Sequence, residues 1–271
     1  MTDQAYDDWE DSEGPDDSSD AEGTDDESGG IQLADFAPLD AGRAIEVLAC
    51  GEVELLGRMP WSSNATFLVA MRLAGDGLHA VYKPGRGERP LWDFPGGLYK
   101  REAAAWVVSD TLGWDLIPTT IVRHDGPFDE GSYQRFVHTD YGQHYFTILE
   151  DETKHERLFQ MGVLDLLLNN TDRKGGHVLI DATGAIWGID NGLCFHPQPK
   201  LRTVIWDFIG RPLPKPWIDD LMRFALAPPQ SLERLLGREE RDVLARRARA
   251  VAARGVFPDP GPNPPHPWPL V

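Results

Sequence analysis

Short apolar runs separated by turn residues dominate the chain between residues 50 and 140. Runs of this length predict strands, here over the ranges 52–56, 65–73, 78–83, 119–123 and 132–137. Gly75-Asp76-Gly77 separates the second run from the third and predicts a hairpin there. Residues 98–112 carry Ala and long side chains in helical order and are followed by Gly113, which predicts one helix among these strands.

The second half of the chain has a helical period instead. Apolar residues recur at helical spacing over residues 153–169 and predict a long buried helix, which runs into the polar stretch Asn170-Thr171-Asp172-Arg173. Two short strands are predicted next, at 178–180 and 186–189. Further helices are predicted over the ranges 216–225, 231–236 and 239–253.

A small β-rich half with one helix, followed by a mainly helical half, predicts an α+β fold with two lobes. We place the N-lobe at residues 36–137 and the C-lobe at residues 138–257, with a ligand cleft between them. Residues 1–35 are predicted to be a disordered acidic tail, and residues 258–271 a proline-rich disordered tail that cannot continue a helix.

The charge of the chain is concentrated at its start. The formal net charge is −18, but residues 1–30 hold thirteen Asp and Glu without Lys or Arg, which leaves about −5 for the rest. We interpret this stretch as a solvating tail in preference to an arm that covers a basic site. The one internal candidate for such a site is the Arg-rich helix predicted near the end of the chain, with arginines from Arg238 to Arg254. The acidic balance also argues against nucleic acid as a partner.

The number of cysteines and the hydropathy of the chain indicate the cellular compartment that we expect. The chain has two cysteines, Cys50 and Cys194, and no N-terminal apolar stretch before a cleavage site, so we expect a reducing cytoplasm. The longest apolar run, residues 161–168, is interrupted by Asp165 and is far shorter than the roughly 20 residues that a membrane-spanning helix needs. We therefore expect no transmembrane segment.

Phosphoryl transfer needs a cation for the nucleotide phosphates, carboxylates for Mg²⁺ and a carboxylate near the attacking hydroxyl. The chain supplies a candidate for each task in a plausible order: Lys83, Glu102, Asp172 and Asp190. Each has an ordinary alternative, because strand-end Lys and helix Glu residues are common on surfaces and Asp residues in loops often cap turns. The joint order along the chain favours phosphoryl transfer.

The loop between the first two predicted strands contains Ser62, Ser63 and Asn64. Small residues let backbone N–H groups and hydroxyls approach phosphate oxygens, so this loop is a candidate phosphate-binding segment. A plain polar hairpin loop would have the same composition. The sequence leaves both interpretations open.

Several stretches resemble the phosphatidylinositol 3-/4-kinase superfamily, most closely the type II phosphatidylinositol 4-kinases and an actinobacterial family related to them. The matching stretches run in family order across residues 52–225 and are Val81-Tyr82-Lys83-Pro84, Glu102-Ala103-Ala104, Ile117-Pro118-Thr119, Gly131-Ser132-Tyr133-Gln134-Arg135-Phe136-Val137, Asn170-Thr171-Asp172-Arg173 and Ile189-Asp190-Asn191-Gly192-Leu193. The resemblance implies a two-lobed kinase-like fold that binds ATP with Mg²⁺ or Mn²⁺.

The resemblance also implies roles for single residues. Lys83 would hold the α and β phosphates with Glu102 as its anchor, and Asp172 would be the catalytic aspartate. Asp190 would be the principal metal ligand. The remaining ATP-binding residues that it implies are Gln134, the hinge pair Phe136 and Val137, and the phosphate loop Ser62, Ser63 and Asn64.

Two departures from the family pattern shape the functional prediction. His177 stands five residues after Asp172, where the family has an Asn as second metal ligand, and imidazole suits Mg²⁺ less well than an amide oxygen. The segment after the lysine strand also lacks the cysteine cluster that type II enzymes carry for palmitoylation. A protein or a small metabolite is therefore favoured over a lipid as acceptor.

The sequence thus predicts an Mg·ATP-dependent phosphotransferase that transfers the γ-phosphate to an unidentified hydroxyl acceptor. His177 keeps a second prediction open, a catalytically weak or inactive nucleotide-binding pseudokinase that regulates a partner protein. Transfer of the AMP moiety in place of phosphate is a third.

Overall fold

Five antiparallel strands form the first part of the fold in the computed structural model, which describes residues 33–59, 65–262 and 264–271. They pair in the order β1-β2-β3-β5-β4. Their bounds are β1 (Glu52–Arg58), β2 (Phe67–Leu73), β3 (Asp76–Pro84), β4 (Thr120–Gly126) and β5 (Asp129–Arg135). Each strand overlaps one predicted strand, so the apolar runs alone indicate where the sheet forms.

The β2–β3 hairpin turns at Ala74 and Gly75, whose φ angles are 52° and 92°. A two-residue hairpin turn of this kind needs positive φ at both positions so that its twist matches the strands. The turn therefore begins one residue before the predicted Gly75-Asp76-Gly77. In the register that results, Lys83 lies opposite Ser132 of β5, near the end of the central strand of the sheet.

A helix that the sequence reasoning missed, α1 (Ala41–Cys50), packs on this sheet. Its buried face consists of Ala44, Val47 and Leu48, which have the i, i+3, i+4 spacing of one helical stripe. Asp40 caps the helix by accepting a hydrogen bond from the backbone N–H of Arg43 at 2.8 Å. The helical spacing of the apolar residues and the capping residue Asp40 were together the sequence signal that could have predicted α1.

The helix α2 (Leu98–Thr111) matches the predicted helix over residues 98–112. It begins after Gly97, which has a φ of 82° that favours glycine. Its small residues Ala103, Ala104 and Ala105 are fully or almost fully buried, so the helix lies close to β4 and β5 on one side and to the larger core on the other.

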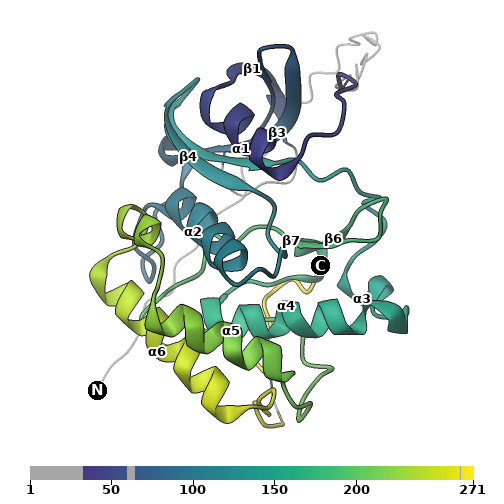
Figure 1. The fold of residues 1–271 in the computed structure, drawn as a ribbon, viewed down its shortest axis with the longest axis vertical. Helices are drawn as coiled ribbons and strands as arrows, with labels where there is room; N and C mark the ends of the chain where they lie inside the picture. The colour runs from purple at the N-terminus through teal and green to yellow at the C-terminus, as the bar shows by residue number, and fades with distance from the viewer. Residues whose placement is uncertain (1–32, 60–64, 263) are drawn as a thin grey trace, which may run out of the picture. The chain divides into compact units, whose positions relative to one another are not determined.

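The rest of the chain is mainly helical, and Figure 1 shows α4, α5 and α6 gathered below the sheet with α2 between. The bounds are α3 (Tyr145–Ile148), α4 (His155–Leu168), α5 (Lys215–Leu226) and α6 (Arg238–Arg254), with a hairpin of β6 (Val178–Ile180) and β7 (Ile186–Gly188). The helix predicted over 231–236 is instead a 3-10 segment, η4 (Gln230–Arg234), confined between Pro229 and Gly237. The described chain thus has the predicted α+β fold with two lobes.

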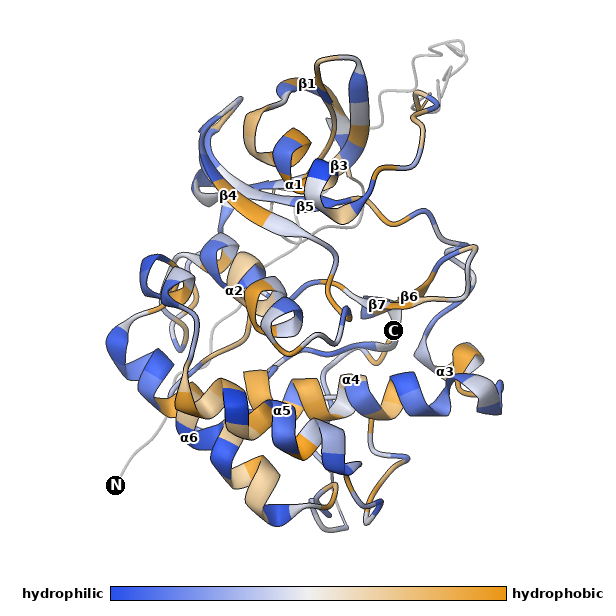
Figure 2. Cartoon of the chain, in the orientation of Figure 1, coloured by the Kyte–Doolittle hydropathy of each residue, from blue (hydrophilic) through white to orange (hydrophobic). Residues whose placement is uncertain are grey.

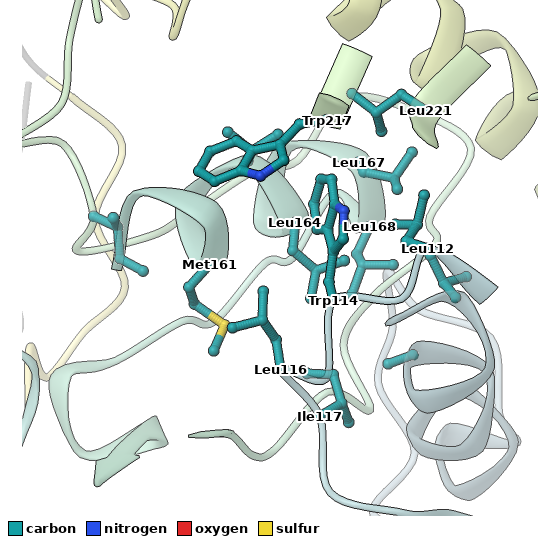
Figure 3. Close-up of a cluster of buried hydrophobic side chains, with 14 of the residues drawn as sticks. Leu112, Trp114, Leu116, Ile117, Met161, Leu164, Leu167, Leu168, Trp217 and Leu221 are labelled. Carbon is teal, nitrogen blue, oxygen red and sulfur yellow. The ribbon is translucent and has the colours of Figure 1, made fainter. Parts of the chain in front are cut away.

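The helix α4 forms the centre of the helical lobe and is buried along almost its whole length. Figure 3 shows Trp114, Leu164 and Trp217 pointing toward one another in this core, and the two indole centroids lie 5.9 Å apart. In Figure 2 the polar residues of α5 and α6 lie on the outer faces of these helices. Burying one Leu side chain contributes about 2 kcal/mol to the stability of the fold. The many buried residues of α4 therefore hold this helix in place, and the loop after it starts from a fixed position.

The structure of the proline-rich end of the chain differs from what the sequence predicts. Residues 258–271 were expected to be a disordered tail, whereas the structure places the described part of this segment against the C-lobe. The backbone N–H of Thr203 donates to Pro265 O at 3.2 Å, and that of Gly175 donates to Leu270 O at 2.6 Å. Proline prevents a helix here, but the carbonyl groups of the segment still accept hydrogen bonds.

Candidate active site

A cavity of about 360 Å³ lies between the sheet and the loops of the helical lobe. All eight predicted site residues that the structure describes line it: Lys83, Glu102, Gln134, Phe136, Val137, Asp172, His177 and Asp190. The other three, Ser62, Ser63 and Asn64, lie outside the described residues. Residues that are up to 107 positions apart in the sequence thus meet at one site.

Lys83 contacts two carboxylates in this cavity. Its Nζ donates to Glu102 Oε1 at 2.5 Å and also contacts Asp190 Oδ1. Burial alone would lower the pKa of Lys83, but the charges of Asp190 and Glu102 outweigh it and raise that pKa above its ordinary value. The ammonium group therefore stays charged at every physiological pH.

Glu102 connects Lys83 to the turn that carries Asp190. Its second carboxylate oxygen, Oε2, accepts a hydrogen bond from the backbone N–H of Asn191 at 2.9 Å. The Glu102 side chain is only 5% exposed, so both bonds form away from bulk water. The contact of Glu102 with Lys83 is compatible with its predicted role as an anchor for the lysine, which stays a prediction. The contact with the backbone of Asn191 was not indicated by the sequence.

Asp190 follows β7 with a φ of 55°, a left-handed conformation that Asp tolerates better than most residues. This backbone turn brings the carboxylate to Lys83 on one side and to His177 Nε2, 3.3 Å from Oδ2, on the other. Burial raises the pKa of Asp190, but the positive charge of Lys83 overcomes this effect and holds the pKa well below its ordinary value. The carboxylate is therefore ionised and can serve as a metal ligand.

Asp172 lies in the loop after α4, residues 169–177, which we call the Asp172 loop. The side chain of Asn170 forms the local turn, because its Oδ1 accepts from the backbone N–H of Asp172 at 2.9 Å. The Asp172 carboxylate is left for the cavity, where Oδ2 lies 3.3 Å from Nζ of Lys174. Lys174 lines the same cavity, and the sequence reasoning did not single it out.

His177 joins the two aspartates of the site. Its Nδ1 lies 2.8 Å from the backbone oxygen of Asp172, and its Nε2 lies 3.3 Å from Asp190 Oδ2. Burial lowers the pKa of His177, so the ring is mainly neutral near pH 7. A neutral imidazole can be a metal ligand, and the role of His177 as a ligand beside Asp190 stays a prediction.

The fit of a divalent cation can be judged from these ligands. Among the described residues, no group of three or more His, Cys, Asp and Glu is arranged to hold a metal by itself. Mg²⁺ is commonly held by one or two carboxylates together with substrate phosphates and water. Asp190 meets that requirement with His177 beside it, so the residues fit a metal that arrives with a nucleotide.

The predicted adenine-facing residues lie at the end of β5 and just beyond it. The backbone N–H of Phe136 donates to His79 O at 2.9 Å, and the Gln134 side chain donates to Thr120 Oγ1 at 3.0 Å. Both groups therefore have partners within the sheet. Phe136 and Val137 contribute apolar wall to the cavity, which suits a flat aromatic base.

Arg173 is a structural residue of the site that the sequence reasoning did not identify. Its side chain is fully buried, and its Nε lies 3.1 Å from Asp165 Oδ1 of α4. Its other nitrogens donate to Ile189 O and to Asn191 Oδ1, both at 2.7 Å. Arg173 thus ties α4 to the segments on both sides of Asp190. An Asp inside an apolar run was the available signal for such a buried pair.

The site combines a strand lysine paired with a helix glutamate, one aspartate after a central helix and another aspartate after a short hairpin. This arrangement is typical of a kinase-like protein. One match to a known protein family agrees with this class. The family described as "Phosphatidylinositol 3- and 4-kinase" matches residues 115–221. "Protein Rv2133c" of Mycobacterium tuberculosis is 40% identical to this chain, and the match covers 82% of this chain and 94% of that protein.

Two solved structures are also similar to this chain. The Helicobacter pylori proinflammatory kinase CtkA has 15% identity and a TM-score of 0.43, with 78% of this chain and 99% of that chain covered. The structure of hydra Fam20 with sugar has 12% identity and a TM-score of 0.47, with 83% and 92% covered. The match to Rv2133c carries the assignment: the chain belongs to the same family as that protein. Within it, residues 115–221 are similar to the phosphatidylinositol 3- and 4-kinases.

Proposed function

We propose that this chain is an Mg·ATP-dependent phosphotransferase that transfers the γ-phosphate to a hydroxyl acceptor. The observation that carries the proposal is the position of Lys83, which contacts Glu102 and Asp190 in the cavity that Asp172 also lines. Phosphoryl transfer depends mainly on positioning and charge stabilisation, and these groups supply a fixed cation and carboxyl groups in one place.

Each residue has a task in this proposal. Two of the three N–H groups of Lys83 have carboxylate partners in the described structure, and the third could donate to a phosphate oxygen. Asp190 would hold the metal, which supplies charge neutralisation on the phosphates when bound. Asp172 would orient the acceptor hydroxyl and accept its proton, while the acceptor oxygen bonds to the γ-phosphorus and the bond to the β-γ bridging oxygen breaks.

For the acceptor, we propose a protein or a small metabolite in preference to a lipid. The described residues include no helix that is long and apolar enough to cross a membrane. The segment after β3 has an exposed Trp92 but no cysteine for lipidation, and one exposed aromatic side chain gives only marginal membrane contact. Action in the cytoplasm stays a prediction from the sequence.

One observation favours a second candidate function, nucleotide binding without efficient transfer. His177 lies 3.3 Å from Asp190, at the position where the family pattern places an asparagine ligand. An imidazole nitrogen is a poorer Mg²⁺ ligand than an amide oxygen, so transfer could be slow while ATP still binds. In that case a His177→Asn variant should gain turnover.

The test is incubation with ATP labelled at the γ or the α position, with Mg²⁺ or Mn²⁺, and with separate protein, metabolite and lipid extracts. We expect γ-label in a protein or metabolite fraction, and its loss in Asp190→Asn. The exposed Asp219→Asn on α5 is the matched control and should transfer normally. Transfer of α-label would indicate AMP transfer instead, and ATP binding without any transfer would favour the second candidate.

A further inference from the structure

Three chain segments that are far apart in sequence lie side by side beneath the active site. The Asp172 loop pairs with residues 202–204, because Arg173 N donates to Arg202 O and Val204 N donates to Arg173 O, both at 3.1 Å. Thr203 also forms hydrogen bonds with residues 264–271, which we call the terminal segment. Its N–H donates to Pro265 O at 3.2 Å, and its own carbonyl oxygen lies 3.2 Å from Nδ1 of His266.

The terminal segment also contacts the Asp172 loop directly. The backbone N–H of Gly175 donates to Leu270 O at 2.6 Å. A Cβ at Gly175 would lie 3.1 Å from Phe146 Cε2 and 3.2 Å from Val271 Cγ2, so a larger residue at this position would crowd the terminal segment. Figure 1 shows the last residue next to the β6–β7 hairpin, which follows the Asp172 loop.

This contact fixes the loop at a point where its sequence provides little stiffness. Gly175 and Gly176 are adjacent, and glycine has more backbone freedom than any other residue. Lys174, which contacts Asp172, comes directly before this pair, and His177, which contacts Asp190, comes directly after it. The buried Arg173 holds the loop on one side of Lys174, and the bond from Gly175 to Leu270 holds it on the other.

A second connection runs through Thr203. Its Oγ1 donates to Asp165 Oδ2 at 3.0 Å, and Asp165 is the buried partner of Arg173. The terminal segment therefore supports the Asp172 loop twice, once through the backbone of Gly175 and once through the residue that completes the Asp165–Arg173 pair.

We propose that the terminal segment, residues 264–271, is a positioning element of the phosphotransfer site that holds Lys174 and His177 in place against Asp172 and Asp190. The inference rests on the proposed function. The segment acts through the backbone of Gly175 and through Thr203, and takes no part in the chemistry. Small displacements of groups around the reacting atoms reduce turnover more than nucleotide affinity, so the expected effect is on kcat.

The test compares the full chain with a chain shortened after Trp268, which lacks only the exposed Leu270 and Val271 and Pro269 before them. We expect kcat to fall by about tenfold or more, because misplacement of about 1 Å can cost 100-fold, with KM for ATP unchanged within about twofold. Leu270→Ala keeps the carbonyl group and is the matched control with normal turnover.

A measurement that needs no turnover keeps the inference separate from the proposed function. In the full chain the Gly175 amide should be protected from hydrogen exchange, and in the shortened chain this protection should be lost while the ¹⁵N shifts of the His177 ring change. A full chain without transfer activity would contradict the proposed function alone. An unprotected Gly175 amide in the full chain, or a shortened chain with unchanged His177 shifts and unchanged turnover, would overturn the positioning role.

Discussion

The carboxylate of Glu102 accepts a hydrogen bond from the backbone N–H of Asn191 at 2.9 Å, so a helix of the N-lobe holds the turn that carries Asp190. The same side chain binds Lys83 through its other oxygen. One buried carboxylate therefore sets the positions of the cation and of the candidate metal ligand together.

The two functions of Glu102 can be separated by substitution. Glu102→Gln keeps an oxygen acceptor but loses the charge opposite Lys83, whereas Glu102→Ala loses both. We expect Glu102→Ala to bind an ATP analogue about tenfold or more weakly, as loss of a charge-assisted hydrogen bond implies, and Glu102→Gln to lie between it and the parent. Calorimetric titration measures both, with the exposed Glu239→Gln as control. Equal affinity in the parent and all three variants would contradict the role of Glu102 in positioning Lys83 and Asp190.

Arg173 should matter for stability more than any exposed arginine. Arg173→Met leaves Asp165 buried without its partner, and breaking a buried pair in this way costs about 3–5 kcal/mol. Adding Asp165→Asn should recover part of that loss because the uncompensated charge is removed. Urea unfolding measures the free energies, and Arg254→Met on the surface of α6 should change stability by less than about 0.5 kcal/mol. A similarly small effect of Arg173→Met would show that the pair is not needed.

Lys174 is expected to take part in the transfer step, since its Nζ lies 3.3 Å from Asp172 Oδ2 in the cavity. Removing one preorganised group that stabilises developing charge typically lowers kcat by about 100-fold or more. Lys174→Ala should show such a loss with little change in ATP affinity, and Lys174→Arg should retain part of the rate. Single-turnover kinetics provide the measurement, and the exposed Lys215→Ala is the control. Normal turnover in Lys174→Ala would exclude this role.

His177 predicts a pH dependence of stability. Burial lowers its pKa below the ordinary 6.5, so between those two values the unfolded chain binds a proton that the folded chain does not. Stability should therefore be fully present above about pH 6.5 and fall as the pH drops below it. His177→Asn removes this contribution, so its unfolding free energy should vary less between pH 7 and pH 5 than that of the parent. Parallel pH profiles in both proteins would show that His177 is not the titrating group.

Most of the fold follows from local sequence. The strand β3 and the helix α4 have mainly apolar stretches, and in α4 the apolar residues recur at helical spacing, which indicates their structure without reference to the rest of the chain. The helix α1 was missed although its stripe is regular, because it is short and precedes the first strong strand. The terminal segment was expected to be disordered because prolines exclude a helix, and its packing depends on carbonyl groups that every sequence has.

The acidic residues and the lysine at the centre of the candidate site were predictable, whereas Arg173, Lys174 and the connections between residues were not. Lys83, Asp172 and Asp190 follow from residue type and order along the chain, and the structure brings them into one cavity. The bond from Glu102 to Asn191 joins a side chain to a backbone group 89 positions away, which no periodic pattern encodes. The roles of these residues in binding and transfer stay predictions that the experiments above address.

The alternation along Asp172, Arg173 and Lys174 affects how an inactive form of this protein should be made. The middle side chain points into the interior and supports the fold, while its two neighbours line the cavity. Replacing Arg173 would silence the protein by damaging it, and a cell that lost activity this way would mimic simple absence of the protein. Asp172→Asn leaves the interior untouched, so under the proposed function it is the appropriate variant for capturing the acceptor in its bound form.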